Sequence, residues 1–395
     1  MTDQPLPLAG LRVLEFTHAV LGPTCGMLLA DFGAEVIKIE PVPEGDPTRY
    51  LQGFGTGFAP FLFRNRKSLA IDLKDPAGAE IIHKLLPTTD ILVENFGPGT
   101  LERLGFGYET LSEQYPQLIY CALKGFMPGP YEKRIALDEI VQMMSGLAYM
   151  TGPPGQPLRA GASITDMTTG MMGAMGILLA LREREQTGKG QLVRSALFET
   201  ATLFMGTHLA ASAVLGHKVP SMAGDRISAW GVYHQFPTVD GRIVFIGVTS
   251  DKQWERFCQV FDRPDLFDNP NLVTNNGRVD AHDWLIPELR QMFAKMDRSE
   301  VIRLCDKANL PFAPVARPED LFDDPHLNET GALLKTTLNS GKTVKLPRVP
   351  VAVGDHDFGL RNEPPVVGAH GEELLAELGY SEEEIGQLRE HGITI

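Results

Sequence analysis

The stretch that decides the fold is LRVLEFTHAVLGPTCGMLLADFGAEVIKIE, residues 11–40. We expect a short strand at Arg12–Phe16, a helix that Pro23 opens and Gly33 ends, and a second strand at Glu35–Glu40. Strand, helix and strand within about 30 residues form a βαβ unit. Such a unit holds its two strands parallel, with a right-handed crossover.

The alternation of strand and helix continues along the first third of the chain. Three further strands are expected, at residues 68–73, 90–94 and 118–123. This pattern predicts an α/β fold with an open, mostly parallel, Rossmann-like sheet in a large domain. Such sheets bind ligands beyond the carboxyl ends of their strands, which here are followed by residues 17–21, 95–97 and 124–126.

A second, smaller domain is expected after Gly216, where the sequence pattern changes. Residues 230–236 and 242–248 form a predicted hairpin and precede three stretches of helical periodicity, which together indicate an α+β domain. One long helix is expected over residues 198–215. The predicted division is a large domain at 1–200, a linker helix at 201–222, a small domain at 223–325, a return linker at 326–345, and the C-terminal part of the large domain at 346–395.

The charge balance is acidic, with 36 Lys and Arg against 50 Asp and Glu, and a formal net charge of −14. This balance argues against general nucleic-acid binding. The start of the sequence shows no signal-peptide pattern, and no uninterrupted apolar run reaches the roughly 18 residues that span a membrane. We therefore expect neither a membrane nor a nucleic-acid partner.

Motifs for metals and tightly bound cofactors do not occur in the sequence. The histidines are scattered without an H-E-x-x-H motif, and there is no dinucleotide fingerprint, complete P-loop or G-x-S-x-G elbow. We expect no metal and no permanently bound cofactor. The cysteines, which form no C-x-x-C pair, suggest buried free thiols and a cytoplasmic protein: Cys25, Cys121, Cys258 and Cys305.

The stretch GASITDMTTG, residues 161–170, leads into an apolar run and carries a carboxylate, Asp166. We expect a helix to begin here, with Thr165 or Asp166 as its N-cap. The positive end of the helix dipole would keep Asp166 ionised, which suits a nucleophile. The alternative is that Asp166 only caps the helix.

Basic residues gather in the otherwise acidic first third of the chain, and several would fall near strand ends. They would suit a polyphosphate ligand, and the alternative is a solvated face. They are Arg64, Arg66, Lys67, Lys74 and Arg103, followed by Lys124, Lys133 and Arg134.

Many short motifs together resemble the class III CoA-transferases, the group of formyl-CoA transferase and carnitine CoA-transferase. They are residues 11–18 with Gly22-Pro23, residues 30–40, 64–67 with 71–74, 93–96 with 101–105, 142–146, and 375–385. The resemblance covers nearly the whole chain. It implies a homodimer of two interlinked ring-shaped chains, each with a large and a small domain.

The resemblance also implies covalent chemistry at Asp166, which matches the family's nucleophile. The aspartate attacks an acyl-CoA thioester, becomes an aspartyl-CoA thioester by way of a mixed anhydride, and passes CoA to an acceptor carboxylate. Coenzyme A thioester is thus a substrate. The family's CoA contacts fall by position on Val20, Leu21, Ile71, Asp72, Leu73, Lys74, Asn95, Phe96, Gly97, Arg103, Ile135, Ala136, Leu137 and Asp138.

Two departures from the formyl-CoA transferase pattern argue against oxalate as the acceptor. Val20 stands in place of a glutamine, and residues 245–250 hold one glycine where that branch has a glycine-rich loop. The candidate substrate residues are His18, Arg226 and His234. Because a second anionic group in a closed pocket needs a fixed cation, we expect a small dicarboxylate or similar dianion as acceptor, with succinyl-CoA as candidate donor.

Two other functions remain open at this point. An α-methylacyl-CoA racemase of the same superfamily shares the fold and the aspartate, but it has a histidine where this chain has Leu137, which cannot abstract an α-proton. A catalytically inactive CoA-binding protein is the other possibility, and the presence of Asp166 in a loop of small residues argues against it.

Overall fold

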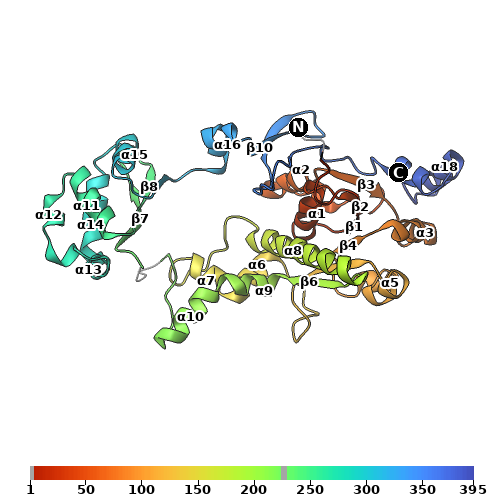
Figure 1. Cartoon of the computed structure of the whole chain (residues 1–395), viewed down its shortest axis with the longest axis horizontal. Coiled ribbons are helices and arrows are strands. Elements are labelled where there is room, and N and C mark those ends of the chain that lie inside the picture. Colours follow the sequence, from red (N-terminus) through yellow and green to blue (C-terminus); the bar gives the residue numbers. More distant parts are fainter. Residues whose placement is uncertain (1–3, 224–228) are drawn as a thin grey trace. The chain divides into compact units, whose positions relative to one another are not determined.

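The chain folds into two compact units, and the computed structural model describes residues 4–223 and 229–395 (Figure 1). The first unit combines Met1–Gly224 with His326–Ile395, and the second is Asp225–Pro325. The two ends of the chain therefore belong to the same unit.

The first unit is built on a six-stranded sheet with the strand order β3-β2-β1-β4-β5-β6. The strands are β1 (Arg12–Phe16), β2 (Glu35–Glu40), β3 (Arg66–Ala70), β4 (Ile91–Glu94), β5 (Ile119–Lys124) and β6 (Leu192–Ala196). All neighbouring pairs are parallel, which confirms the predicted α/β fold. β1 pairs with both β2 and β4, so the carboxyl ends of β1 and β4 border the crevice at which such sheets bind ligands.

Helices cover both faces of this sheet, because its strands are apolar on both sides. Val13 packs in the cluster that contains residues of α1 (Leu21–Asp31) and α8 (Ile164–Thr187). The next residue, Leu14, packs in the opposite cluster. That cluster contains residues of α3 (Pro76–Leu85), α5 (Tyr108–Gln114), α17 (Gly371–Glu377) and α18 (Glu382–Glu390).

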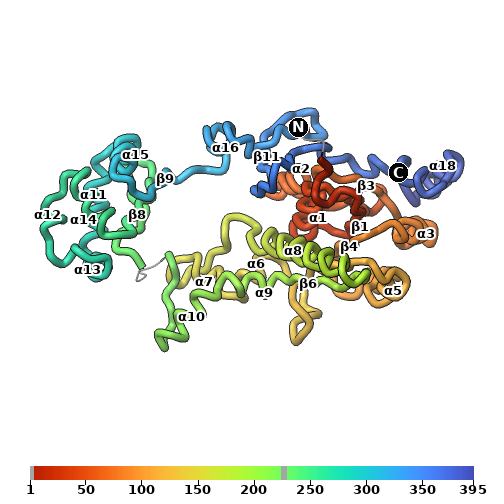
Figure 2. The backbone as a smooth tube through the Cα atoms, in the orientation of Figure 1, coloured from red at the N-terminus to blue at the C-terminus, as the bar shows by residue number. Residues whose placement is uncertain are grey.

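The C-terminal helices close the first unit against its N-terminal strands, as Figure 2 shows by the blue tube beside the red and orange one. α17 contacts β3, and Glu377 lies 2.7 Å from Arg12. Glu373 lies 2.7 Å from Lys67. These ion pairs join the two segments that the second unit separates in sequence.

The helix α8 is 24 residues long and contains an 18-residue window with a mean hydropathy of 1.4, so by length and composition alone it could cross a membrane. The sequence has no uninterrupted apolar run of that length, because the helix begins before the apolar run and its window includes isolated polar residues. It packs against α1, β5 and β6. A Cβ added at Gly170 would lie 2.6 Å from the Leu21 carbonyl oxygen, and one at Gly173 would lie 2.5 Å from Leu123. The small residues of α8 thus seat it closely on the sheet and on α1, as a core helix is seated.

The other elements of the first unit are mostly short. They are α2 (Phe58–Leu62), α4 (Thr100–Arg103), α6 (Asp138–Ser145), α7 (Leu147–Thr151), α9 (Leu197–Phe204), α10 (Gly206–Leu215) and the antiparallel pair β10 (Leu333–Thr337) and β11 (Thr343–Pro347). The single helix predicted over residues 198–215 is wrong: α9 and α10 are separated at Met205, which leaves the helical conformation just before Gly206.

The second unit holds an antiparallel sheet of β7 (Val232–Pro237), β8 (Ile243–Val248) and β9 (Phe312–Pro314). The expected hairpin is present, and Gly241 in its turn has a φ of 72°, which glycine adopts readily. The helices are α11 (Asp251–Val260), α12 (Pro264–Phe267), α13 (Asn275–Asp280), α14 (His282–Phe293) and α15 (Arg298–Lys307). α16 (Pro325–Glu329) follows them.

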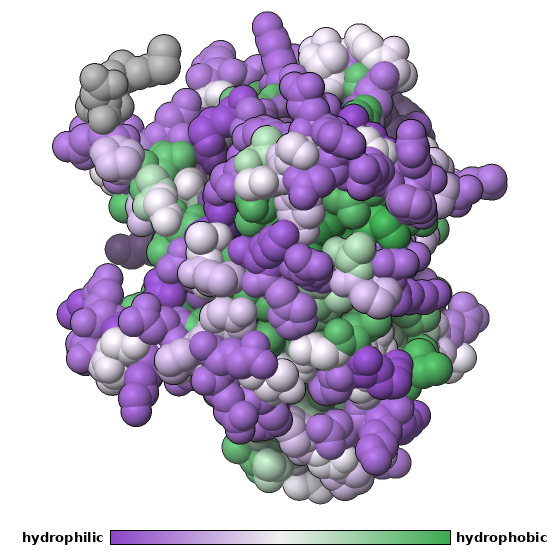
Figure 3. Space-filling view, turned by 90° about the vertical axis from the view of Figure 1, so that its right-hand side faces the viewer, coloured by the Kyte–Doolittle hydropathy of each residue, from purple (hydrophilic) through white to green (hydrophobic). Residues whose placement is uncertain are grey.

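On the face of the molecule in Figure 3, hydrophilic residues form most of the surface and apolar residues appear as separate patches.

Candidate active site

A cavity of about 260 Å³ lies in the first unit, where the loops after β1, β4 and β5 meet the first turn of α8. Many of the predicted site residues line it together: His18, Leu21, Asn95, Phe96, Gly97, Ile135, Ala136, Leu137 and Asp166. Lys124 and Arg134 also line it. The carboxyl edge of the parallel sheet therefore forms a site around Asp166, as the strand pattern predicts.

The other predicted CoA contacts lie outside the lining of this cavity. Val20 is buried in an apolar cluster beside Phe63. Ile71 to Lys74 follow β3, where Ile71 pairs with Thr394 at the C-terminus. Arg103 donates from Nη2 to the Thr100 hydroxyl at 3.1 Å. Since CoA is much longer than a cavity of this size, contacts of these residues with its distant parts stay predictions.

Asp166 stands in the first turn of α8, which begins at Ile164 after Ser163. Neither Thr165 nor Asp166 is the N-cap, so that expectation is wrong, and the Ser163 side chain makes no capping hydrogen bond. The capping acceptor comes from another helix. One carboxylate oxygen of Asp138 accepts from the backbone N–H of Thr165 at 2.9 Å and of Asp166 at 3.1 Å, and from the Thr165 hydroxyl.

Asp138 is itself fixed by Gln142, one turn further along α6. The Gln142 amide donates to the second carboxylate oxygen of Asp138 at 2.5 Å and accepts from the backbone N–H of Ala160 at 2.8 Å. Asp138 and Gln142 are both buried. The first turn of α6 therefore fixes the first turn of α8, and with it the reactive candidate Asp166. Sequence reasoning placed Asp138 only among the CoA contacts and missed this role, although its spacing from Gln142 puts both on one helix face.

The carboxyl group of Asp166 is half-buried, and its surroundings disfavour its charged form. Desolvation raises its pKa to about 7, the negative charge of Asp138 acts in the same direction, and Arg159 opposes both. The expectation of a permanently ionised carboxylate is therefore wrong, because desolvation outweighs the helix dipole. A carboxyl group that titrates near neutrality is typical of a functional site.

Arg159 is a residue of the site that sequence reasoning did not select. Its Nε donates to the Ala160 carbonyl oxygen at 2.9 Å, and its Nη1 lies 2.5 Å from the Glu139 carboxylate. Glu139 neighbours Asp138 on α6. The spacing of Arg159 before a helix that begins with a carboxylate was the available signal, but many surface arginines share it.

The basic residues of the first third have mainly structural partners. The fully buried Arg64 and Arg66 pair with Asp31 at 2.7 Å and Glu15 at 3.0 Å. Lys67 lies 2.7 Å from Glu35. The polyphosphate interpretation is therefore wrong for these three, since their charges are already used inside the fold.

The three candidate substrate residues fall in different places. His18 lines the cavity, where desolvation lowers its pKa against the opposing charge of Asp46, so its ring is neutral at pH 7. His234 lies in the second unit on β7, with its Nε2 at 2.8 Å from the Nε2 of His282. Arg226 lies outside the described residues. Among the residues that the structure describes, no group of three or more metal-binding side chains gathers.

The family model of CoA-transferase family III matches residues 8–371, so the chain belongs to this family and is a CoA-transferase. It is 32% identical to succinyl-CoA:glutarate CoA-transferase of Homo sapiens, over 98% of this chain and 90% of the human protein. It is 34% identical to the beta subunit of succinyl-CoA–L-malate CoA-transferase of Chloroflexus aurantiacus, over 98% of both chains. The solved structure of a CAIB/BAIF family protein from Brucella suis is similar, with a TM-score of 0.84, 30% identity, and coverage of 95% of this chain and 100% of that one.

Proposed function

We propose that the protein transfers CoA from an acyl-CoA thioester to a small carboxylic acid, with Asp166 as the covalent carrier. The observation that supports this most directly is the half-buried Asp166 carboxyl group in the cavity at the carboxyl edge of the sheet. Its pKa of about 7 leaves a basic carboxylate available at neutral pH. Its backbone N–H is held by Asp138, so the side chain projects from a fixed helical turn.

The proposed reaction proceeds through two exchanges that balance without an outside reagent. The Asp166 carboxylate attacks the thioester carbonyl, the C–S bond breaks, and a mixed anhydride and the CoA thiolate form. The thiolate then attacks the Asp166 carbonyl, and the donor acid leaves as its carboxylate. The acceptor carboxylate reverses both steps, which regenerates Asp166 and yields the new thioester. The cavity walls must exclude water throughout, because both intermediates hydrolyse.

The proposed acceptor is a small dicarboxylate, with succinyl-CoA as donor. Two similar proteins are named for succinyl-CoA with glutarate or with L-malate. Arg134 supplies a cation in the cavity: it packs on Tyr131 at 4.9 Å and forms no ion pair with a described residue. Lys124, by contrast, lies 2.6 Å from Glu94 and is largely neutralised. We therefore assign the second carboxylate, or a phosphate of CoA, to Arg134 rather than to Lys124.

The test of this function is an acceptor panel with succinyl-CoA as donor. Glutarate, malate, itaconate, oxalate, carnitine and an aromatic acid are compared, and hydroxylamine is added to trap an Asp166 adduct for mass spectrometry. We expect transfer to dicarboxylates and a modified Asp166 peptide. Transfer only to carnitine or the aromatic acid would contradict the dicarboxylate proposal, and no adduct despite transfer would contradict the covalent mechanism.

The residue that distinguishes the racemase alternative is Leu137. It lines the cavity with a hydrocarbon side chain where the racemase would place its histidine. We expect no exchange of the α-proton of an acyl-CoA in D₂O, measured by mass spectrometry, since Leu137 provides no base. Rapid deuterium uptake would favour the racemase.

We also propose that the protein acts as a homodimer. Apolar side chains are exposed along α8, α9 and α10, and larger exposed apolar patches are unusual on monomers. They include Met171, Met175, Leu178, Leu179, Leu203, Leu209, Val214 and Leu215. Light scattering after size-exclusion chromatography should give twice the mass of the chain, and a mass of one chain would contradict the proposal.

A further inference from the structure

The loop between β1 and α1 forms one wall of the cavity and has an unusual backbone conformation. His18 and Leu21 line the cavity, and Ala19 between them has a φ of 59°. A residue with a Cβ seldom adopts this left-handed conformation, and it persists only where surrounding contacts enforce it. The question is which contacts enforce it here.

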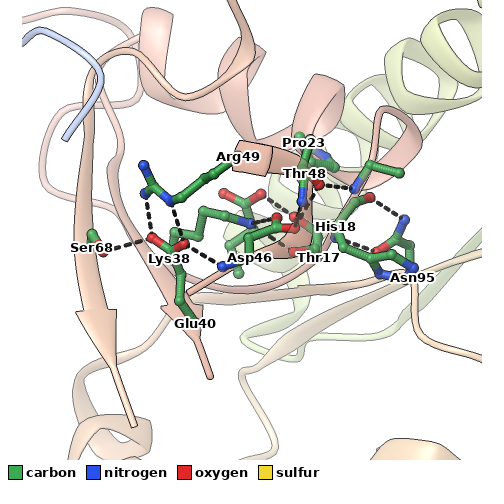
Figure 4. Close-up of polar contacts among 12 residues, drawn as sticks. Thr17, His18, Pro23, Lys38, Glu40, Asp46, Thr48, Arg49, Ser68 and Asn95 are labelled. Atoms are coloured by element: carbon green, nitrogen blue, oxygen red, sulfur yellow. Dashed lines mark hydrogen bonds and ion pairs between the residues drawn. The ribbon is translucent and has the colours of Figure 1, made fainter. Parts of the chain in front are cut away.

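Four backbone polar atoms of residues 17–19 are held by side chains from other segments (Figure 4). Asn95 accepts from the N–H of His18 at 2.9 Å and donates to its carbonyl oxygen at 3.0 Å. Lys38 donates to the Thr17 carbonyl oxygen at 2.7 Å. The Thr48 hydroxyl oxygen accepts from the N–H of Ala19 at 2.8 Å. The last of these bonds acts on the residue with positive φ itself.

The direction of the Thr48 hydroxyl group is fixed by the residues behind it. The hydroxyl donates to one carboxylate oxygen of Asp46 at 2.6 Å, so its lone pair faces Ala19. Asp46 also accepts from the backbone N–H of Thr48 at 2.8 Å, and its other oxygen lies 2.8 Å from the Lys38 ammonium group. All three side chains are buried. Lys38, Asp46 and Thr48 therefore form one hydrogen-bonded network. This network binds the loop at the Thr17 carbonyl oxygen and at the Ala19 N–H.

The other end of the loop is wedged against α8. The loop has little room to move, because a Cβ added at Gly22 would lie 2.5 Å from the Thr17 Cβ. One added at Gly170, a turn beyond Asp166, would lie 2.6 Å from the Leu21 carbonyl oxygen. A shift of the loop would therefore change the distance between the cavity wall and the first turn of α8.

We propose that Thr48 is a positioning residue for CoA transfer: its hydroxyl holds Ala19 in the left-handed conformation and thereby sets the wall from His18 to Leu21 against Asp166. This inference rests on the proposed function of Asp166. Thr48 acts through the loop and not on the substrate. Its loss should therefore lower kcat more than it raises KM.

The first experiment compares Thr48→Val, which keeps the shape but not the hydroxyl, with Thr48→Ser, which keeps the hydroxyl. Because small misplacements at a reacting centre cost large factors, we expect kcat for succinyl-CoA to glutarate transfer to fall roughly 10- to 100-fold in Thr48→Val. Thr48→Ser should stay close to the wild type. The matched control is Thr89→Val, which removes another buried hydroxyl group. The Thr89 hydroxyl donates to the Leu85 carbonyl oxygen. Thr89 precedes β4, so it lies at the amino ends of the strands, away from the cavity.

A second substitution separates positioning from simple loss of stability. Glycine adopts positive φ without the steric penalty of a Cβ. Ala19→Gly in the Thr48→Val background should therefore restore a large part of kcat. Amide hydrogen exchange of the peptide that contains Ala19 should be faster in Thr48→Val than in Thr48→Ser or the wild type, which reports on the loop without any substrate.

The outcomes are distinct. Wild-type kcat in Thr48→Val overturns the inference while leaving the proposed function intact. A kcat that falls together with melting temperature, and that Ala19→Gly does not restore, also overturns it, since the role is then only structural. If the wild-type enzyme transfers CoA to no acceptor, the proposed function fails and the positioning role fails with it, whatever hydrogen exchange shows.

Discussion

Two regions of the first unit enclose carboxylates and treat them in opposite ways. Beside β2, Glu40 lies 2.6 Å from Arg49 and Asp46 lies 2.8 Å from Lys38, with all four side chains nearly or fully buried. At the cavity, Asp166 has no cation within ion-pair distance among the described residues. Both regions lie in the first unit, so the same unit holds buried paired carboxylates and an unpaired carboxyl group at Asp166.

The difference is visible in the direction of each pKa. Desolvation would raise the pKa of Glu40 and of Asp46, but the cations and hydrogen bonds around them outweigh it and lower both. For Asp166 desolvation prevails, and the pKa rises to about 7. A paired carboxylate holds its charge and fixes structure, whereas an unpaired one near neutrality can change its bonding. The five predictions that follow test this contrast.

The largest effect is expected for Asp166→Ala. Removing the covalent carrier should lower transfer by roughly a thousandfold or more, as losses of catalytic nucleophiles do. CoA binding by calorimetry should persist, because the CoA contacts lie on other residues. Glu185→Ala, on an exposed site of the same helix, is the control and should transfer normally. Substantial transfer by Asp166→Ala would show that Asp166 is not the covalent carrier.

The next effect is on stability and concerns the paired region. Lys38→Met leaves Asp46 buried without its cation, and breaking such a pair costs about 3–5 kcal/mol of unfolding free energy. Urea denaturation at pH 7 should show this loss. Arg182→Met breaks the exposed pair with Glu185 and should cost less than about 1 kcal/mol. Equal losses in the two variants would mean that burial does not distinguish the pairs.

The pH dependence of the paired region follows from the lowered pKa of Asp46. Its stabilising contribution is fully present above the unfolded value, about 3.9, and is lost as pH falls through the lower folded value. In Lys38→Met the ammonium group no longer opposes desolvation, so the pKa of Asp46 rises and the folded variant takes up the proton at a higher pH than the wild type. The difference in stability between the two should therefore be largest at neutral pH and shrink as pH falls, beginning above the unfolded value of about 3.9.

The stability contribution of the unpaired carboxyl group of Asp166 should change with pH in the opposite direction. The folded-state pKa of Asp166, about 7, lies above the unfolded value, so the folded state holds the proton more tightly. Its stability contribution is therefore fully present below the unfolded value of about 3.9, is lost as pH rises towards 7, and stays lost above pH 7. Asp166→Asn cannot ionise and should melt at a higher temperature than the wild type at pH 8. The difference in melting temperature should shrink as pH falls and close near pH 4, the unfolded value. A lower melting temperature for Asp166→Asn at pH 8 would contradict the assigned pKa.

The sheet and the place of the site could be predicted from the sequence, because short apolar strands that alternate with helices are local signals. β1, β2 and the position of the loop after β1 follow from residues 11–40 alone. The hydrogen bonds that hold the site could not be predicted. Asp138 caps a helix 27 residues further along, and Thr48 holds Ala19 across 29 residues, so both depend on the folded chain.

The incorrect expectation that Asp166 stays ionised has a similar origin. The helix dipole is a local property, so the sequence suggested an ionised Asp166, whereas desolvation and the charge of Asp138 come from distant segments. The basic residues mislead for the same reason. Arg64 and Arg66 look like an anion site in sequence, but their carboxylate partners, Asp31 and Glu15, come from α1 and β1.

The smallest expected effect concerns Arg159, a cation that acts on Asp166 without forming an ion pair with it. The positive charge of Arg159 lowers the pKa of Asp166, against desolvation and Asp138. Its removal in Arg159→Met should raise that pKa, and the loss of the ion pair leaves the negative charge of Glu139 to act in the same direction. The transferring form of Asp166 is the deprotonated one. The acidic limb of kcat/KM against pH should therefore move to higher pH, while Arg182→Met should leave it in place. Because the position of the limb is independent of the plateau rate, a general loss of activity cannot imitate this shift, and a limb that stays or moves to lower pH would show that Arg159 does not act on the Asp166 charge.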